Sequence, residues 1–236
     1  DDILDMFEGL ARHLFQEIRG LEFHEPFPRI PYDEAMSLYG SDKPDIRFDM
    51  RITEITENVK GRNFPPFEQA AYAGAVSVPG CAGWSRKQLD ELTEFVRRPQ
   101  IGGKGLIWAK VEADGTVKSS ADKYYSADDL ANIALMTGSD AGDLILMMAG
   151  PREKTLNALG ELRLEMGRRL GLRSSEVYAP LWVVDFPLLE WDDETQRFYA
   201  KHHPFTAPKP EDIQYMESDP WRVRANAYDL VINGTE

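Results

Sequence analysis

The sequence predicts an α+β fold in which one compact unit interrupts a larger scaffold. Between residues 67 and 170, strand-like and helix-like segments alternate closely, which indicates a compact unit of strands and helices. The pattern of residue types along the chain changes at about residue 48. We interpret the first and last thirds of the chain as parts of one scaffold. We therefore expect a domain inserted into another, with bounds near 1–47, 48–172 and 173–236.

The composition is that of an ordinary folded protein. The chain has 236 residues, of which 42% are hydrophobic and 28% charged, enough for one large domain or two of average size. No segment approaches the about 18 apolar residues of a membrane span, and the acidic start DDILD is unlike a signal peptide. Because Cys81 is the only cysteine, an intrachain disulfide and a cysteine zinc site are excluded, which fits a cytoplasmic protein.

The net charge of −13 argues against broad electrostatic binding of nucleic acid, which depends on Lys and Arg neutralising phosphates. A local basic patch remains open, because one face of a protein can differ from the total. One stretch is conspicuously basic, and we interpret it as a solvated helix face. It carries Arg152, Lys154, Arg163, Arg168, Arg169 and Arg173.

Two helices separated by prolines are predicted in the first third. Apolar residues at steps of three and four make residues 3–19 an amphipathic helix, which ends at Gly20. A second helix begins at Pro31 and stops at Gly40. The following residues, 41–45, have the sequence SDKPD and are predicted to form a turn.

The middle third is predicted to alternate strands and helices. Strands cover residues 67–78, 105–111 and 143–148, where small, β-branched or apolar residues run between turn signals. Two shorter helices begin at serine caps, and a long helix spans residues 151–170. The caps are Ser85, whose helix ends at Arg97, and Ser126, and the long helix stops at Gly171.

The last third carries further strand-like segments. The apolar run 180–187 ends at a proline and is too short for a helix. Residues 190–195 are predicted to form a polar loop, and residues 196–201 to return as the second arm of a hairpin. A strand over residues 226–232 leads into Asn233-Gly234.

Two adjacent histidines, His202 and His203, follow the predicted hairpin. Neighbours in an extended chain point to opposite faces, so at most one of them addresses a given pocket. A histidine at the mouth of a sheet can hold a polar ligand near neutral pH. The alternative, that both are surface residues at the end of the hairpin, stays open at this point.

Asp229 and Glu236 are two carboxylates with an odd sequence spacing. On a regular strand this spacing places two side chains on opposite faces, which counts against a shared metal. Gly234 weakens the objection, because glycine in a strand often marks a bulge that shifts the phase by one residue. Two carboxylates brought together would hold Mg²⁺ and, through it, a polyphosphate. The alternative is a hairpin turn at Asn233-Gly234 with both acids solvated, and spacing alone does not decide.

Four strings in the flanking thirds are together specific to one family. They are YGSDKPDIR at 39–47, WVVDFP at 182–187, HHPFTAP at 202–208 and NAYDLVINGTE at 226–236. In this order and spacing they resemble the bacterial-type aspartyl-tRNA synthetases, and the resemblance runs the whole length of the chain. The middle unit, with VPG at 78–80, SRKQ at 85–88 and KGL at 104–106, is similar to the insertion (GAD) domain of that family. This likeness implies a two-layer α/β sandwich of an antiparallel sheet and helices for the middle unit.

This resemblance implies a class II catalytic domain, an antiparallel sheet flanked by helices, and a two-step reaction. ATP activates L-aspartate to aspartyl-adenylate, and the aspartyl group then passes to the 3′ end of tRNA-Asp. His202, with its neighbour His203, matches residues that bind substrate aspartate. Asp229 and Glu236 match carboxylates that bind ATP through Mg²⁺. The full-length family enzyme is expected to be a cytoplasmic homodimer without membrane attachment.

By the same resemblance, the chain is expected to be a piece of a longer enzyme. It begins beyond the second class II motif and stops before the third, so the anticodon-binding barrel, the dimer motif and the arginines that hold ATP are expected elsewhere. No residue of the chain is assigned a catalytic role of its own. Alone, the chain is expected to show neither aminoacylation nor adenylation.

Two other functions remain as alternatives. One is a stand-alone tRNA-binding module, related to the insertion domain of the amidotransferase B subunit, that uses the middle unit and the basic helix 151–170. Tight and steeply salt-dependent binding of tRNA would support it. The other is a small metal-dependent hydrolase built on His202, His203, Asp229 and Glu236, which stoichiometric transition metal would support.

Overall fold

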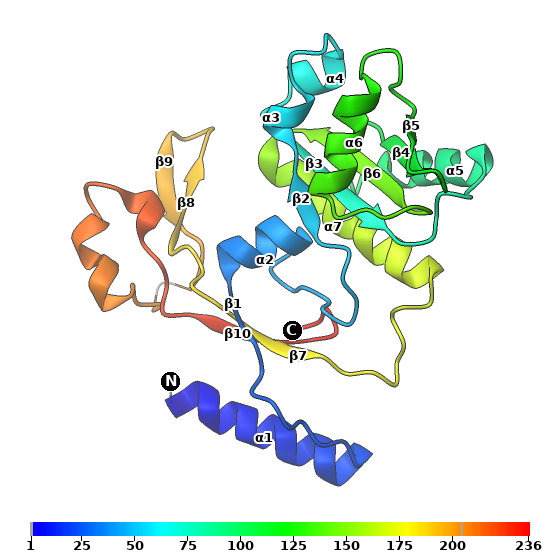
Figure 1. The fold of residues 1–236 in the computed structure, drawn as a ribbon. Coiled ribbons are helices and arrows are strands. Elements are labelled where there is room, and N and C mark those ends of the chain that lie inside the picture. The colour runs from blue at the N-terminus through cyan, green and yellow to red at the C-terminus, as the bar shows by residue number, and fades with distance from the viewer. Residues whose placement is uncertain (1, 204) are drawn as a thin grey trace.

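Two β-sheets organise the chain, which the computed structural model describes over residues 2–203 and 205–236 (Figure 1). The fold is mixed α+β, as predicted. A five-stranded sheet has the order β2-β3-β6-β4-β5, a three-stranded sheet has the order β1-β7-β10, and β8 and β9 form a separate hairpin. The strands are β1 (Arg29–Pro31), β2 (Ile52–Glu54), β3 (Tyr72–Val78), β4 (Ile107–Val111), β5 (Val117–Ser119), β6 (Leu144–Gly150), β7 (Pro180–Val184), β8 (Leu189–Asp192), β9 (Arg197–Ala200) and β10 (Tyr228–Ile232). The helices are α1 (Asp2–Arg19), α2 (Tyr32–Tyr39), α3 (Thr56–Val59), α4 (Pro65–Glu68), α5 (Arg86–Val96), α6 (Ala127–Met136) and α7 (Arg152–Arg169), with short 3-10 helices η1 (Pro210–Tyr215) and η2 (Pro220–Arg222).

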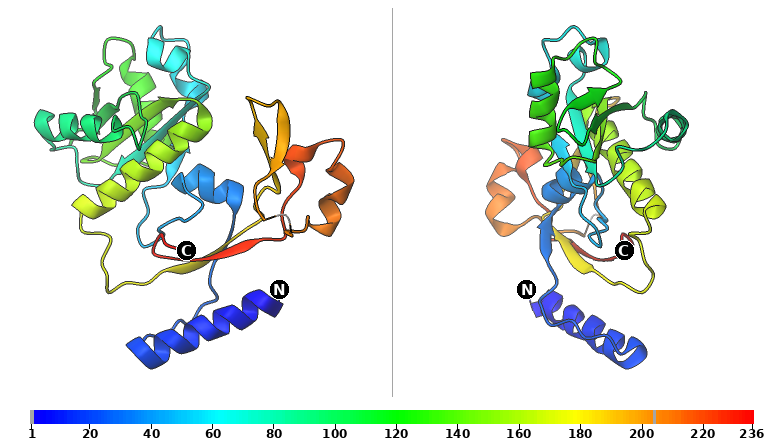
Figure 2. Two further views of the ribbon diagram at one scale, coloured as in Figure 1. Left: turned by 180° about the vertical axis from the view of Figure 1, so that it is seen from behind. Right: turned by 45° about the vertical axis from the view of Figure 1, so that its right-hand side comes forward.

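The five-stranded sheet is antiparallel throughout and comes from one continuous stretch, residues 52–150. Its central strands β3 and β6 are buried on both sides, so both faces need apolar cover. Side chains of α5 and α7 pack on one face, and those of α3, α4 and α6 pack on the other (Figure 2). The unit therefore has three layers rather than the two expected from the sequence.

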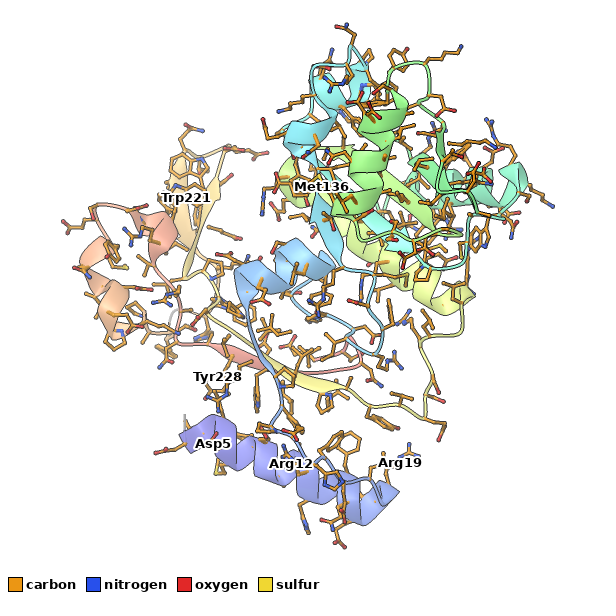
Figure 3. All side chains as sticks on the ribbon, viewed as in Figure 1. Asp5, Arg12, Arg19, Met136, Trp221 and Tyr228 are labelled. Carbon is orange, nitrogen blue, oxygen red and sulfur yellow. The ribbon has the colours of Figure 1, made fainter. Side chains whose placement is uncertain are left out.

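The three-stranded sheet joins segments from the first and last thirds of the chain. Its middle strand, β7, pairs in parallel with β1 and antiparallel with β10. The wholly antiparallel sheet implied by the family resemblance is thus wrong for the β1–β7 pair. Alternate residues of β7 face opposite sides, since Trp182 packs toward α1 and Val183 packs toward α2. Tyr228 of β10 lies on the α1 side (Figure 3).

Local signals set the helix ends as predicted. Ser85 and Ser126 each accept a hydrogen bond from the backbone N–H three positions on, and both form complete capping boxes. Gly20, Gly40 and Gly171 adopt positive φ just beyond α1, α2 and α7. These helices therefore begin and end where the sequence indicates.

Two predicted boundaries differ from the structure. The first residues of the predicted polar loop belong to β8, in which Trp191 pairs with Phe198 of β9. The strand predicted from residue 67 begins only at Tyr72. Pro65 and Pro66 instead start the one-turn helix α4, because proline suits the first positions of a helix.

Helix α1 leaves much of its apolar face exposed. Leu4 and Ala11 are buried against the three-stranded sheet, but Met6 and Ile18 are 62% and 72% exposed. Further exposed apolar residues of this helix are Ile3, Phe7, Leu10 and Leu14. The apolar period predicts the helix correctly, but it does not predict burial of the whole apolar face in this chain.

The basic stretch around α7 is not one solvated face. Arg163 is only 1% exposed, because α7 lies across residues 40–49 and this side chain points into the contact. Arg168 and Arg169 form ion pairs with Glu165 at 2.8 and 2.7 Å. The predicted solvated face is therefore wrong for Arg163 and holds for the exposed Arg168.

Candidate functional site

A tight turn after β10 positions the two predicted carboxylates. Asn233 and Gly234 have φ values of 57° and 82°, the combination of a type I′ turn, for which Asn-Gly is the preferred pair. The N–H of Ile232 donates to the carbonyl of Thr235 at 2.8 Å, and the N–H of Thr235 donates back at 3.1 Å. The chain therefore reverses within two residues and carries Glu236 back along β10.

This turn brings Asp229 and Glu236 to one face. Because Ile232 opposes Thr235, the register of a two-residue hairpin places Glu236 opposite Val231, and Asp229 shares a side of β10 with Val231. An odd spacing across such a turn thus gives one face, not two. The predicted bulge at Gly234 is wrong, and the alternative prediction of a hairpin turn at Asn233-Gly234 is confirmed.

The two acids differ in their surroundings. The side chain of Glu236 is 48% exposed, whereas Asp229 is half-buried. Burial is the main cause that raises the pKa of Asp229, and the negative charges of Glu236 and Asp42 raise it further. The alternative in which both acids are solvated is therefore wrong for Asp229.

Asp42 and Lys43 join this cluster from the turn after α2, and sequence reasoning missed them. Lys43 Nζ lies 2.5 Å from Glu236 Oε2, and this bond raises the pKa of Lys43. Asp42 raises the pKa of Asp229, while Lys43 lowers it. A signal existed in the string SDKPD, whose charges sit on a turn, but no local pattern shows which strand that turn approaches.

His202 is also close enough to Asp229 to lower the pKa of that carboxyl. Its ring lies edge-on to Phe186 with 5.5 Å between centroids. Its Nε2 is buried without a hydrogen-bond partner among the described residues. Since a buried polar atom without a partner costs free energy, this nitrogen suits a ligand that supplies the missing hydrogen bond.

An aromatic chain fixes the position of His202. Phe186 packs against Tyr32 of α2 at 5.3 Å between ring centroids. Lys201 Nζ donates to the hydroxyl of Tyr32 at 2.8 Å and also lies over its ring. The residue before His202 is therefore tied to α2, and the histidine ring rests on the end of this chain.

His203 occupies a different environment from its neighbour. It is exposed, its Nδ1 accepts a hydrogen bond from the backbone N–H of Phe205 at 3.3 Å, and its ring contacts that of Phe205. The structure thus brings His202, Asp229 and Glu236 together and leaves His203 outside this group. Pro204, the residue between His203 and Phe205, lies outside the described residues.

The charges of this cluster favour a divalent cation. Asp42, Asp229 and Glu236 contribute three negative charges, and Lys43 opposes them with one positive charge. Within residues 2–203 and 205–236, no group of three or more His, Cys, Asp or Glu side chains is arranged to hold a metal by itself. Mg²⁺ fits both facts, because it commonly takes one or two carboxylates and completes its shell with water and phosphate oxygens.

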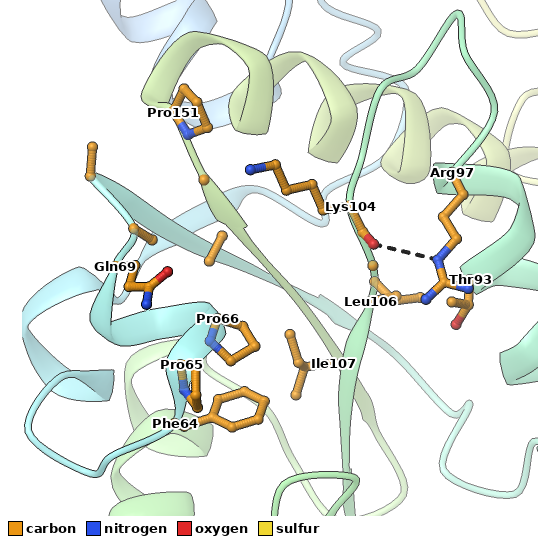
Figure 4. Close-up of a pocket in the computed structure, with 15 residues that line it drawn as sticks. Phe64, Pro65, Pro66, Gln69, Thr93, Arg97, Lys104, Leu106, Ile107 and Pro151 are labelled. Carbon is orange, nitrogen blue, oxygen red and sulfur yellow. Dashed lines mark hydrogen bonds between the residues drawn. The ribbon is translucent and has the colours of Figure 1, made fainter.

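A hollow of about 540 Å³ opens beside this cluster. It is lined by Ser41 and Asp42 of the turn, by Tyr32 and Lys201, and by α7. Another hollow, of about 690 Å³, lies between α4, α5 and β4 and is mainly apolar, with Lys104 and Arg97 at its edge (Figure 4). Asp42 is the one member of the cluster among the residues that line the first hollow, and no member of the cluster lines the second. The candidate site is therefore the cluster itself, with the first hollow beside it.

Comparison with known proteins gives the same family of tRNA synthetases in each case. The family model of class II tRNA synthetases (D, K and N) matches residues 1–236. The chain is 56% identical to the aspartate–tRNA ligase of Bacteroides fragilis, 54% identical to that of Porphyromonas gingivalis and 53% identical to that of Flavobacterium psychrophilum. Each match covers 100% of this chain and 40% of the relative. The chain thus spans well under half the length of these curated relatives.

Proposed function

This chain belongs to the class II tRNA synthetases (D, K and N), and from that premise we propose that it is part of an aspartate–tRNA ligase. The complete enzyme would activate L-aspartate with ATP and transfer the aspartyl group to the 3′ end of tRNA-Asp. The observation that carries the proposal is identity of 53–56% to ligases of this name along the entire chain. The cluster of Asp229, Glu236 and His202 supports it, because its groups suit the two substrates.

We propose that Asp229 and Glu236 hold ATP through Mg²⁺. When bound, Mg²⁺ would neutralise charge on the phosphates. Lys43 adds a fixed positive charge beside Glu236, and the half-buried position of Asp229 strengthens its interaction with any cation. The turn at Asn233-Gly234 places both carboxylates on one face of β10, which suits the binding of a single ion.

We propose that His202 binds the substrate aspartate. Its buried Nε2 has no partner among the described residues, and a substrate carboxylate would supply one. His203 was assigned to the same substrate, and we keep it as a proposal for the outer edge of the site only, because it is exposed beside Phe205.

We propose the division into residues 1–47, 48–172 and 173–236 as scaffold, insertion domain and scaffold. Two facts support it: the three-stranded sheet draws its strands from the flanking segments, and the five-stranded sheet draws its strands only from residues 52–150. The likeness of the middle unit to the GAD domain remains part of this proposal.

We also propose the remaining properties from the family. The partner is tRNA-Asp, the full-length enzyme is a homodimer, and it works in the cytoplasm. In the described part of the chain, no helix combines the length and apolarity needed to cross a bilayer. Alone, the 236-residue chain is expected to catalyse no aspartate-dependent exchange.

The two alternatives fit the observations less well. A stand-alone tRNA-binding module leaves the match of the flanking segments to a synthetase family without explanation. A hydrolase that uses a transition metal such as zinc commonly holds it with three protein ligands, and the described residues offer no such group. Neither has an observation in its favour.

The test is ATP–pyrophosphate exchange with the full-length protein that contains this chain. Because the family includes enzymes for three amino acids (D, K and N), the assay compares aspartate, asparagine and lysine. We expect exchange with aspartate alone, loss of exchange in Asp229→Asn and Glu236→Gln, and normal exchange in Asp193→Asn on the exposed hairpin loop. Exchange that responds to asparagine or lysine but not to aspartate would overturn the proposal.

A further inference from the structure

The contact between α7 and residues 40–49 is made around one buried arginine. Arg163 Nη2 donates to the carbonyls of Asp45, Phe48 and Asp49 at 2.8, 2.7 and 2.9 Å. Its guanidinium also lies over the rings of Tyr39 and Phe48, at 4.9 and 4.0 Å from their centroids. One side chain of α7 thus binds three carbonyls of residues 45–49, a segment that crosses the proposed boundary between the scaffold and the middle unit.

Glycines on the same face of α7 allow this contact to be close. A Cβ on Gly160 would lie 2.7 Å from the carbonyl oxygen of Gly40. A Cβ on Gly167 would lie 2.7 Å from the ring of Phe48. Gly160, Arg163 and Gly167 follow the helical spacing of one face, so the helix backbone packs directly on the segment and leaves it little room to move.

The same segment reaches the candidate site on its other side. Asp45 is fully buried and forms an ion pair with Arg47 at 2.6 Å. A Cβ on Gly234 would lie 3.3 Å from the Cβ of Asp45, so the turn that carries Glu236 packs on this residue. Asp42 and Lys43, three and two positions before Asp45, face Asp229 and Glu236.

We propose that Arg163 is a positioning residue for the candidate site: it holds residues 40–49 so that Asp42 and Lys43 stand against Asp229 and Glu236. The inference rests on the proposed function, because it concerns the binding of ATP and aspartate at that site. It gives the middle unit a role in the adenylation step, although that unit supplies none of the predicted ligands.

The chemistry of the contact explains why an arginine is used. Bonds from a guanidinium to carbonyl oxygens are charge-assisted and short, and the planar group stacks between two rings as an ammonium cannot. Burial lowers the pKa of Arg163 to about 10, so the group remains charged at neutral pH. Keeping a charge in a buried contact is costly, which sets this residue apart from ordinary packing.

A double-mutant cycle in the full-length protein tests the inference. Arg163→Lys keeps the charge and removes the stacked fork, and Lys43→Ala removes the group that it is proposed to position. ATP–pyrophosphate exchange gives kcat and the KM values for ATP and aspartate. We expect each single variant to raise these KM values by about tenfold or more, since a small displacement of a side chain in an active site has a large effect on the reaction. The double variant should be no worse than the poorer single variant.

A purely structural role predicts a different pattern. Arg163→Lys would then lower the melting temperature with unchanged KM, or the two changes would combine additively within about twofold, as for independent sites. Either result would overturn the inference. Arg168→Met is the matched control on the same helix, and its KM values should stay within about twofold of the wild type in both backgrounds.

Two further provisions keep the test decisive. If Arg163→Lys does not fold, Phe48→Leu takes its place in the cycle, because it removes the ring beneath the guanidinium. If the wild-type protein shows no aspartate-dependent exchange, the proposed function fails. If the wild-type protein shows normal exchange and Arg163→Lys leaves both KM values unchanged, the positioning role of Arg163 is rejected and the proposed function is retained.

Discussion

Replacing Gly234 by alanine separates the shape of the turn from the stability of the fold. Gly234 has φ of 82°, and an L-residue with a side chain in this region costs about 1–2 kcal/mol. The new Cβ would lie 3.3 Å from Asp45 Cβ and 3.6 Å from the carbonyl oxygen of Lys43, contacts that a small shift of the turn relieves. The dihedral penalty is therefore the main effect.

The dihedral penalty can lower the stability of the fold or raise the KM for ATP. If the turn keeps its shape, the free energy of unfolding falls by about 1–2 kcal/mol. If the turn opens, Glu236 leaves Asp229, and the KM for ATP rises by up to about tenfold, since about 1.4 kcal/mol corresponds to a factor of ten. The assay is chemical denaturation together with ATP–pyrophosphate exchange in the full-length protein, with ATP and Mg²⁺ varied.

The chain offers a closely matched control. Gly115 has φ of 83° in a turn of the middle unit, and no atom lies within 4 Å of its added Cβ. Gly115→Ala should lose similar stability with an unchanged KM for ATP. Gly234→Asn should be milder than Gly234→Ala, because asparagine tolerates the left-handed region. Equal KM values in the two alanine variants, with both destabilised, would refute the reasoning that the turn positions Glu236.

Three further predictions concern single residues. Burial is the main cause that raises the folded-state pKa of Asp229, so its ionisation opposes folding as pH rises. In urea denaturation, Asp229→Asn should therefore be more stable than the wild type at pH 7, and the difference should vanish below pH of about 4, the ordinary pKa of aspartate. The pKa of Glu165 is lowered to about 2, mainly by its hydrogen bond to Arg168. Glu165→Gln should therefore lower the free energy of unfolding by about 1–2 kcal/mol at pH 7 and hardly change it near pH 2. A difference that stays constant across this pH range would contradict the ion-pair explanation. His202→Ala should raise the KM for aspartate by about tenfold or more, whereas His203→Ala should change it by less than about threefold. Steady-state ATP–pyrophosphate exchange measures both values, and equal effects would contradict the assignment of His202, but not His203, to the site.

Much of the secondary structure follows from local sequence. Serine caps, helix-ending glycines and proline interruptions act on the residues next to them, so Ser85, Ser126 and Gly171 mark boundaries that the structure confirms. The short strands β1 and β2 were not predicted. Strands of three residues carry too little pattern, and only pairing with a distant strand defines them.

The predictions that failed depend on distant partners. A basic residue in a helix is usually solvated, but Arg163 is buried because the carbonyls of residues 45–49 meet it there. The bulge expected at Gly234 is a turn, because Asn233 also has positive φ. The turn has a local signal, since Asn-Gly is the preferred pair of a type I′ turn, whereas the partners of Arg163 are not encoded within a few residues of that position.

By itself, the sequence determined the α+β class, the boundaries of the longer helices and the family, because caps, periodicity and motif strings are local in the chain. The tertiary structure alone decided that Asp229 and Glu236 share a face, that Asp42 and Lys43 join them, and that His203 does not. The physical reason is that a site is a set of distances across the fold, set by strand register and by the packing of α7 on residues 40–49. Spacing along the chain does not contain those distances.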